Sequence, residues 1–176
     1  MKLKAKKKLT NSDKDYLAGF LDGDGSILTQ IVPGSSYKYG HTIRVSVVFY
    51  QSTTRHWFLL KLQKLVGAGW KLRKRNDKMS ELCVTGFTPV KNFLVVLLPH
   101  FRLKKRLARL VLEIIEEYNK VQSEADFLQV CLKIDKTAEY TYSKKRKHTY
   151  SSVKAYLNSP VETEKIFNLP IANKSC

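Results

Sequence analysis

The sequence is poor in acidic residues and in long apolar runs, and each shortage excludes a class of protein. Only 15 Asp and Glu stand against 32 Lys and Arg in 176 residues, which leaves a formal net charge of +17. A surplus of this size favours a polyanionic partner such as nucleic acid or an anionic membrane surface. The longest apolar run is six residues, 93–98, far below the roughly 20 that a membrane-spanning helix needs. We therefore expect no membrane partner.

Cysteine is also scarce. Cys83, Cys131 and Cys176 are odd in number and far apart, which indicates neither a disulfide framework nor a CxxC zinc site and favours a reducing compartment. The four histidines likewise lack the paired spacing of zinc ligands. With 43% hydrophobic residues, the chain is long enough for one domain with a substantial core. We expect that domain at residues 1–160, followed by a tail at residues 161–176.

Residues 16–26, YLAGFLDGDGS, form the most informative stretch of the chain. Ser12, Asp13 and Asp15 predict an N-cap and an acidic first turn, and the apolar residues that follow predict a helix ending near Asp22. Asp22 and Asp24 then oppose the partial negative charge of the helix C-terminus and require a compensating cation, for which Mg²⁺ is the candidate. An ordinary helix with a glycine-rich end would show the same spacing.

Small residues line one side of this helix. Gly19 and Gly23 lie four apart beside Ala18, so another backbone can approach closely. Because Asp22 and Asp24 do not share a helical face, a carboxylate pair at one metal would arise more naturally from two copies of the helix. The interface expected between two copies comprises Tyr16, Ala18, Gly19, Leu21, Asp22 and Gly23.

The rest of the pattern predicts an α+β fold of αββαββα order, with a curved antiparallel sheet and extra C-terminal helices. Alternation of apolar residues predicts strands at 26–32, 42–51, 70–75 and 81–85. Helical spacing, together with Thr88 as N-cap and Pro89 as the first helical residue, predicts helices at 54–66, 88–98, 102–118, 124–137 and 151–157.

The sheet is also the expected nucleic-acid surface, because one face must pack on helices and leaves the polar alternate positions on the other. Arg and Gln can pair bidentately with guanine and adenine, and a β-ribbon fits the major groove. A solvated sheet face would alternate similarly, but the cationic character favours DNA. Lys144 and Arg146, in a basic run, are expected to contact phosphates. The expected contacts on the sheet and its loops are Gln30, Ser36, Tyr37, Lys38, Thr42, Arg44, Ser46, Tyr50, Lys71, Arg73 and Arg75.

The motif at residues 16–26 resembles the LAGLIDADG motif of homing endonucleases. From about residue 15 to 160, the chain is similar to the single-motif, homodimeric branch encoded in algal chloroplast group I introns. The similarity continues in order through YKYGHTIRVSVVFYQ, TRHWFLLKL and FRLKKRLARLVLEII. The resemblance implies a site-specific double-strand DNA endonuclease for intron homing. It would act as a homodimer with the sheet as its DNA-binding saddle, cut a long pseudo-palindromic site and leave short 3′ overhangs. The implied location is the chloroplast, with the mitochondrion as the alternative.

The resemblance also assigns residues to the reaction. It implies that Asp24 and the Gly23 carbonyl bind metal, with two or three Mg²⁺ per dimer and Mn²⁺ as a substitute. Gln51 and Arg55 match the positions that organise water and phosphate, and Lys104 matches the active-site lysine. By themselves, these three residues also fit a strand-end cap, a first-turn surface charge and one of several helix cations.

Other functions remain open on the sequence. An intron RNA maturase, with intron RNA as its partner, would share the motif. A non-catalytic DNA-binding regulator would explain the charge and the sheet but not the acidic helix end, and a ribosomal protein would explain the charge alone. The intact set of Asp24, Gln51, Arg55 and Lys104 favours the nuclease.

Overall fold

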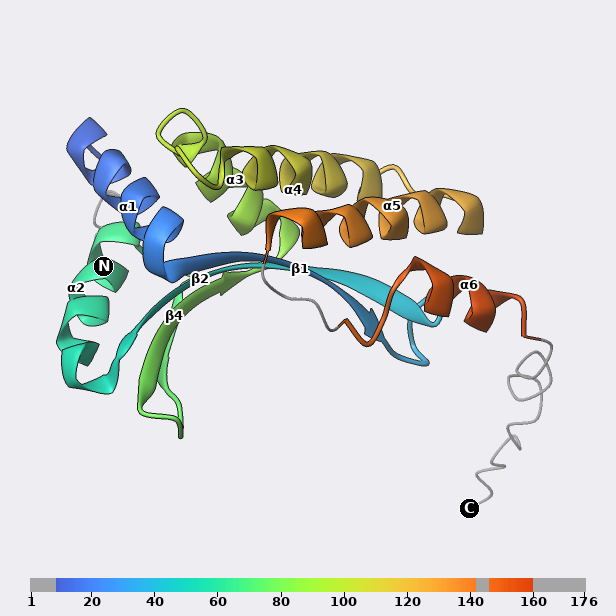
Figure 1. The fold of residues 1–176 in the computed structure, drawn as a ribbon, viewed down its shortest axis with the longest axis horizontal. Coiled ribbons are helices and arrows are strands. Elements are labelled where there is room, and N and C mark those ends of the chain that lie inside the picture. The colour runs from blue at the N-terminus through green and yellow to red at the C-terminus, as the bar shows by residue number, and fades with distance from the viewer. Residues whose placement is uncertain (1–8, 142–145, 160–176) are drawn as a thin grey trace, which may run out of the picture.

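The computed structural model describes residues 9–141 and 146–159 (Figure 1). The elements in chain order are α1 (Asn11–Asp24), β1 (Gly25–Pro33), β2 (His41–Ser52), a 3₁₀ turn (Thr53–Arg55), α2 (His56–Val66), β3 (Lys71–Lys74), β4 (Met79–Thr85), α3 (Phe87–Leu97), α4 (Lys105–Tyr118), α5 (Glu124–Lys136), a second 3₁₀ turn (Thr137–Tyr140) and α6 (Tyr150–Leu157). The predicted αββαββα order with added C-terminal helices is confirmed. None of the described helices has the length and apolar character needed to cross a membrane.

The four strands form one antiparallel sheet in the order β1-β2-β4-β3. β1 pairs with β2 from Gly25 opposite Phe49 to Pro33 opposite His41, whereas β4 pairs with β2 only between Ser46 and Ser52. The outer parts of β1 and β2 therefore extend beyond the other strands as a two-stranded ribbon.

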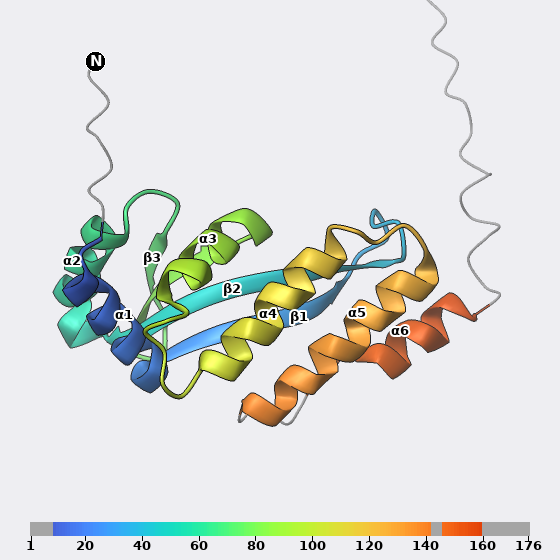
Figure 2. The same ribbon diagram turned by 90° about the horizontal axis from the view of Figure 1, so that it is seen from above.

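The helices divide the sheet into a covered face and an open face. Figure 1 shows α3, α4 and α5 above the convex face, and Figure 2 shows α4 and α5 crossing over β1 and β2. Alternate sheet residues such as Val45, Val47 and Phe49 enter the core there, against buried helix residues such as Leu94 and Val111. Among the described residues, no helix layer covers the concave face, which therefore stays open.

Several helix starts differ from the prediction. Thr10, not Ser12, is the N-cap of α1, and it forms a capping box with Asp13. α3 begins at Phe87 behind Gly86, whose φ of +112° suits glycine, so Thr88 and Pro89 lie inside the first turn. α4 begins at Lys105 rather than at residue 102, because an acidic side chain from α1 holds the backbone just before it.

Candidate active site and nucleic-acid interface

The carboxylate of Asp22 binds the backbone at the start of α4. Its oxygens accept hydrogen bonds from the backbone N–H groups of Arg102, Leu103 and Lys104 at 2.8, 3.1 and 2.9 Å. A carboxylate is favourable at a helix N-terminus, where N–H groups lack helical partners. Asp22 therefore joins the end of α1 to the start of α4.

Lys104 makes the converse contact. Its Nζ donates to the backbone carbonyls of Leu21 and Asp22 at 2.8 and 2.6 Å. Burial lowers the pKa of Lys104, an effect that the charges of Asp22 and Asp24 oppose. The ammonium group thus supplies part of the positive charge that the end of α1 was expected to need, and the sequence had assigned that charge to a metal alone.

Asp24 is the last residue of α1 and is exposed. The chain turns directly into β1 at Gly25, where a Cβ would lie 2.8 Å from the Leu21 Cα; only glycine permits this turn. In residues 9–141 and 146–159, no side chain forms a hydrogen bond or ion pair with the Asp24 carboxylate. It remains available at the edge of the open face.

The donor atoms at this helix end suit a hard cation. Lys104 binds the carbonyls of Leu21 and Asp22, and the Gly23 carbonyl belongs to the same last turn of α1, where helix carbonyls lack the usual helical partners. In the described part of the chain, no three His, Cys, Asp or Glu side chains gather as a metal cluster. One carboxylate and one carbonyl nevertheless fit Mg²⁺, which retains several waters and binds substrate phosphates.

Gln51 and Arg55 lie at the end of β2 and in the 3₁₀ turn that follows it. The pairing of Gly25 with Phe49 places this end of β2 beside the end of α1. The Gln51 Oε1 accepts a hydrogen bond from the backbone N–H of Ser52 at 3.0 Å, and Arg55 is exposed. Within the described residues, neither side chain bonds to Asp24 or Lys104, so their role around a metal stays a prediction.

The expected interface on α1 is partly wrong. Ala18 and Leu21 are completely buried in the core of their own chain, because they fall on the helical face that packs on the sheet. Gly19 and Gly23 are exposed, and a Cβ at either would meet nothing within 4 Å. Tyr16 is also exposed. The open stripe is therefore narrower than the sequence indicated.

The sequence analysis did not predict that large apolar side chains would be exposed near this stripe. Leu103 is 79% exposed, and Trp57 on α2 is 56% exposed. Trp57 stacks edge-on against Phe58, which in turn contacts Tyr16. The signal available in the sequence was an apolar residue inside the otherwise basic run FRLKKR.

The open sheet face carries most of the predicted nucleic-acid contacts. Strand register places Gln30 opposite Arg44, and Lys71 opposite Cys83. Tyr50 lies opposite Glu81, which in turn lies opposite Arg73. Ser36 and Tyr37 are exposed in the turn that joins β1 and β2. The side chains of Gln30, Arg44, Tyr50, Lys71 and Arg73 share one face, as alternation predicted.

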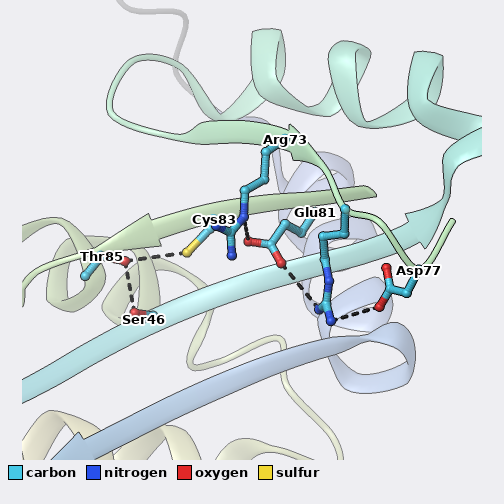
Figure 3. A network of polar contacts seen from close by, with 7 residues as sticks. Ser46, Arg73, Asp77, Glu81, Cys83 and Thr85 are labelled. Atoms are coloured by element: carbon cyan, nitrogen blue, oxygen red, sulfur yellow. Dashed lines mark hydrogen bonds and ion pairs between the residues drawn. The ribbon is translucent and has the colours of Figure 1, made fainter. Parts of the chain in front are cut away.

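Glu81 organises the arginines on this face, and the sequence reading missed it (Figure 3). Glu81 is only 6% exposed. Its carboxylate accepts a hydrogen bond from Arg73 Nε at 2.5 Å and lies 3.5 Å from one terminal nitrogen of Arg75. The other terminal nitrogen of Arg75 pairs with Asp77 at 2.8 Å. The alternation of side chains along β4 could have predicted this position, since Glu81 falls on the open face opposite Tyr50.

Besides Arg73 and Arg75, three further predicted DNA contacts have partners inside the chain. Ser46 is 6% exposed and shares a 2.9 Å hydrogen bond with Thr85, so its assignment as a DNA contact is wrong. Thr42 shares a 3.0 Å hydrogen bond with the Tyr118 hydroxyl. Lys38 donates to the backbone carbonyl of Gln122 at 3.1 Å. Thr42 and Lys38 therefore hold the ribbon against the helical layer in this structure.

The basic run also departs from the prediction. Lys144 lies outside the described residues. Arg146 donates from its two terminal nitrogens to the Ile134 carbonyl at 2.6 Å and to Thr137 Oγ1 at 2.8 Å, and burial lowers its pKa. The guanidinium caps the end of α5, so Arg146 already has partners inside the chain, and the phosphate contact expected of it stays a prediction.

Comparison with known proteins agrees with this geometry. The sequence model described as LAGLIDADG endonuclease matches residues 17–112. The chain is 42% identical to DNA endonuclease I-CreI of Chlamydomonas reinhardtii over 151 residues, which are 85% of this chain and 91% of that protein. It is 44% identical to DNA endonuclease I-CvuI of Chlorella vulgaris over 131 residues, or 74% and 81% of the two chains.

Solved structures show the same fold. I-CvuI bound to the I-CreI target in the presence of Mg superposes with a TM-score of 0.78 at 40% identity, covering 83% of this chain and 92% of that one. An archaeal intron-encoded homing endonuclease in complex with DNA, I-Vdi141I, has a TM-score of 0.72 at 16% identity, with coverage of 84% and 95%. The curved sheet with its helical layer is common to them.

Proposed function

The chain belongs to the LAGLIDADG endonuclease family, and we propose that it is a site-specific, Mg²⁺-dependent endonuclease that cuts double-stranded DNA. The observation that carries the proposal is the position of Asp24. Asp22 and Lys104 fix the end of α1 from both sides, while the Asp24 carboxylate stays exposed beside the open cationic sheet. A metal-binding acid next to a polyanion-binding surface suits hydrolysis of a phosphodiester.

The chain's own residues position the reaction. Mg²⁺, when bound, supplies charge neutralisation at phosphorus and acidifies a bound water. Asp24 and the Gly23 carbonyl would hold the ion, and Asp22 keeps that helix end in place through α4. Lys104 stabilises developing negative charge from its site at the helix end, while Gln51 positions water and Arg55 contacts phosphate.

The concave face is the proposed DNA-binding surface. Gln30, Arg44, Lys71, Arg73 and Arg75 are exposed there. Glu81 restrains two of these arginines, which lowers the entropy that they would lose on pairing with a base. Exposed arginines held in place by a buried carboxylate support base reading rather than a merely solvated sheet.

A homodimer completes the proposal, because the chain carries one motif and a double-strand break requires two active sites. The exposed glycine stripe on α1 and the apolar side chains of Tyr16, Trp57 and Leu103 support this assembly. Two-fold symmetry then predicts a pseudo-palindromic target. The resemblance to the family, and not the symmetry, implies short 3′ overhangs and two or three metal ions per dimer. Chloroplast location, Mn²⁺ substitution and intron RNA as a second partner stay predictions.

The test is cleavage of a randomised double-stranded plasmid library in Mg²⁺, followed by sequencing of the cut ends. Asp24→Asn and a Ca²⁺ reaction are the loss-of-function arms, and Glu113→Gln is the control for loss of an exposed carboxylate elsewhere. We expect one long pseudo-palindromic site, cut by the wild type and by Glu113→Gln only. Cleavage by Asp24→Asn at the wild-type rate would refute the assigned chemistry. Tight RNA binding without DNA cutting would favour the maturase.

A further inference from the structure

The outer part of the β1–β2 hairpin lacks support from the rest of the sheet. β4 reaches β2 only as far as Ser46, so the ribbon continues alone for five β2 residues to His41, or about 17 Å. A two-stranded ribbon is marginally stable by itself. A rotation of about 5° at its base would displace a tip about 17 Å away by about 1.5 Å, enough to break a hydrogen bond to a base edge.

One brace on the ribbon comes from the connection between α4 and α5. Tyr39 is 9% exposed and stacks on Phe127 of α5 with ring centroids 5.0 Å apart. The Tyr39 hydroxyl and the Lys38 ammonium both donate to the Gln122 carbonyl at 3.1 Å. Figure 2 shows this connection next to the end of the ribbon.

A second brace comes from α6. Gly40 has a φ of +64°, and the Tyr156 ring lies so close that a Cβ on Gly40 would come within 2.1 Å of it. The same ring meets His41 edge-on at 5.1 Å, and His41 faces His148 at 5.8 Å. Figure 1 places α6 beside this end of β1 and β2. The backbone of the tip therefore rests on an aromatic side chain.

α6 is itself firmly attached, so the brace is anchored. The backbone N–H of Tyr150 donates to Asp135 of α5 at 2.9 Å, and Val153 is completely buried. A chain of contacts thus runs from α5 through α6 and Tyr156 to Gly40. A hollow of about 510 Å³ lies between α6 and the turn of the β1–β2 hairpin. The packing between α6 and the hairpin is therefore concentrated at few points.

We infer that Tyr156 is a positioning residue for DNA recognition: it holds the tip of the β1–β2 hairpin in the orientation that reads the outer base pairs of the target. The inference rests on the proposed function, because only bound DNA gives the orientation a consequence. Tyr156 acts through Gly40 and His41 and does not itself contact a base. Its loss changes which outer bases are preferred, while the active site at the other end of β1 is unaffected.

The first experiment needs no DNA and tests the brace directly. Hydrogen exchange of the free protein is compared between wild type, Tyr156→Ala and Tyr156→Phe. Gly34 and Gly40 report on the tip, because their backbone N–H groups are hydrogen-bonded within it. We expect exchange at these amides to rise roughly tenfold or more in Tyr156→Ala, with Tyr156→Phe close to wild type. Unchanged exchange in Tyr156→Ala would overturn the brace.

The second experiment tests its consequence. A randomised duplex library is bound in Ca²⁺, which separates binding from cutting, and the retained duplexes are sequenced. Tyr140→Ala is the control, because Tyr140 is 43% exposed against 41% for Tyr156. We expect Tyr156→Ala to lose base preference at the outer positions and to keep it at the inner ones. The Tyr156→Phe and Tyr140→Ala proteins should keep both.

The outcomes separate the two proposals. If the wild type selects no sequence, the proposed function fails, while hydrogen exchange still decides whether the brace exists. If the wild type selects a site and Tyr156→Ala selects the same one, the positioning role is overturned. An equal weakening at inner and outer positions, with a lower melting temperature, would indicate an ordinary loss of stability and would also overturn it.

Discussion

Asp22 and Lys104 cap each other's helices across 82 positions of sequence. The Asp22 carboxylate accepts hydrogen bonds from the backbone N–H groups just before α4, and the Lys104 ammonium donates hydrogen bonds to carbonyls in the last turn of α1. Each charge lies at the helix end that favours it. Asp22 and Lys104 together fix the helix end that carries Asp24. The position of the proposed metal ligand therefore does not depend on contacts made by Asp24.

Asp22 and Asp24 should separate stability from activity. Asp22→Ala leaves three N–H groups without their acceptor and should lower the free energy of unfolding by about 1–3 kcal/mol. Asp24→Asn removes an exposed carboxylate from a helix C-terminus and should leave stability unchanged or raise it by a few tenths of a kcal/mol. Urea denaturation monitored by circular dichroism measures both. Equal destabilisation by the two substitutions would contradict the reciprocal cap.

Lys104 should give stability a pH dependence. Burial lowers its folded-state pKa from the ordinary 10.5, so between the folded value and 10.5 the unfolded chain binds more protons. Stability from this group therefore rises as pH rises through that window. The difference in unfolding free energy between wild type and Lys104→Met, measured from pH 7 to 10.5, should increase with pH. A flat difference would show that burial does not perturb the ammonium group.

Glu81 should control the ionisation of Tyr50 and the choice of bases. The pKa of Tyr50 is raised by burial first and by the Glu81 charge second. Glu81→Gln should therefore lower it, as measured by ultraviolet titration of tyrosinate. Asp77→Asn is the matched control, because Asp77 pairs with Arg75 and is not among the causes of the shift. Glu81→Gln should also alter base preference beneath β3 and β4. An unchanged Tyr50 pKa would argue against the electrostatic contact.

Gly19→Leu should abolish the dimer without unfolding the chain. Nothing lies within 4 Å of a Cβ at this position, and leucine is more favourable than glycine in a helix by about 0.8 kcal/mol. Sedimentation velocity should show a monomer. The melting temperature of this monomer should be equal to or above that of the wild-type chain in its monomeric form. Glu113→Leu, an exposed apolar substitution on α4, should remain dimeric. A stable Gly19→Leu dimer would place the interface elsewhere.

Local pattern was enough for much of the architecture. Apolar alternation in residues 42–51 identified β2 and the face that packs on helices, because strand periodicity is a property of neighbouring residues. The motif located Asp24 at a helix end for the same reason. The wrong predictions concern residues whose role depends on contacts with other parts of the structure. Thr10 rather than Ser12 caps α1, because its side chain accepts a hydrogen bond from the Asp13 N–H. Ala18 and Leu21 are interior because α1 lies on the sheet.

The sequence by itself determined the order of helices and strands, the cationic face and the acidic end of α1, since each follows from residues close together in the chain. Only the tertiary structure decided which groups from distant parts of the chain meet. Lys104 reaches the end of α1, Arg146 turns inward to α5, Glu81 joins two arginines, and Tyr156 supports Gly40. Contacts such as Lys104–Asp22 and Tyr156–Gly40 depend on the packing of distant elements, and no local periodicity encodes which side chains such packing will bring together.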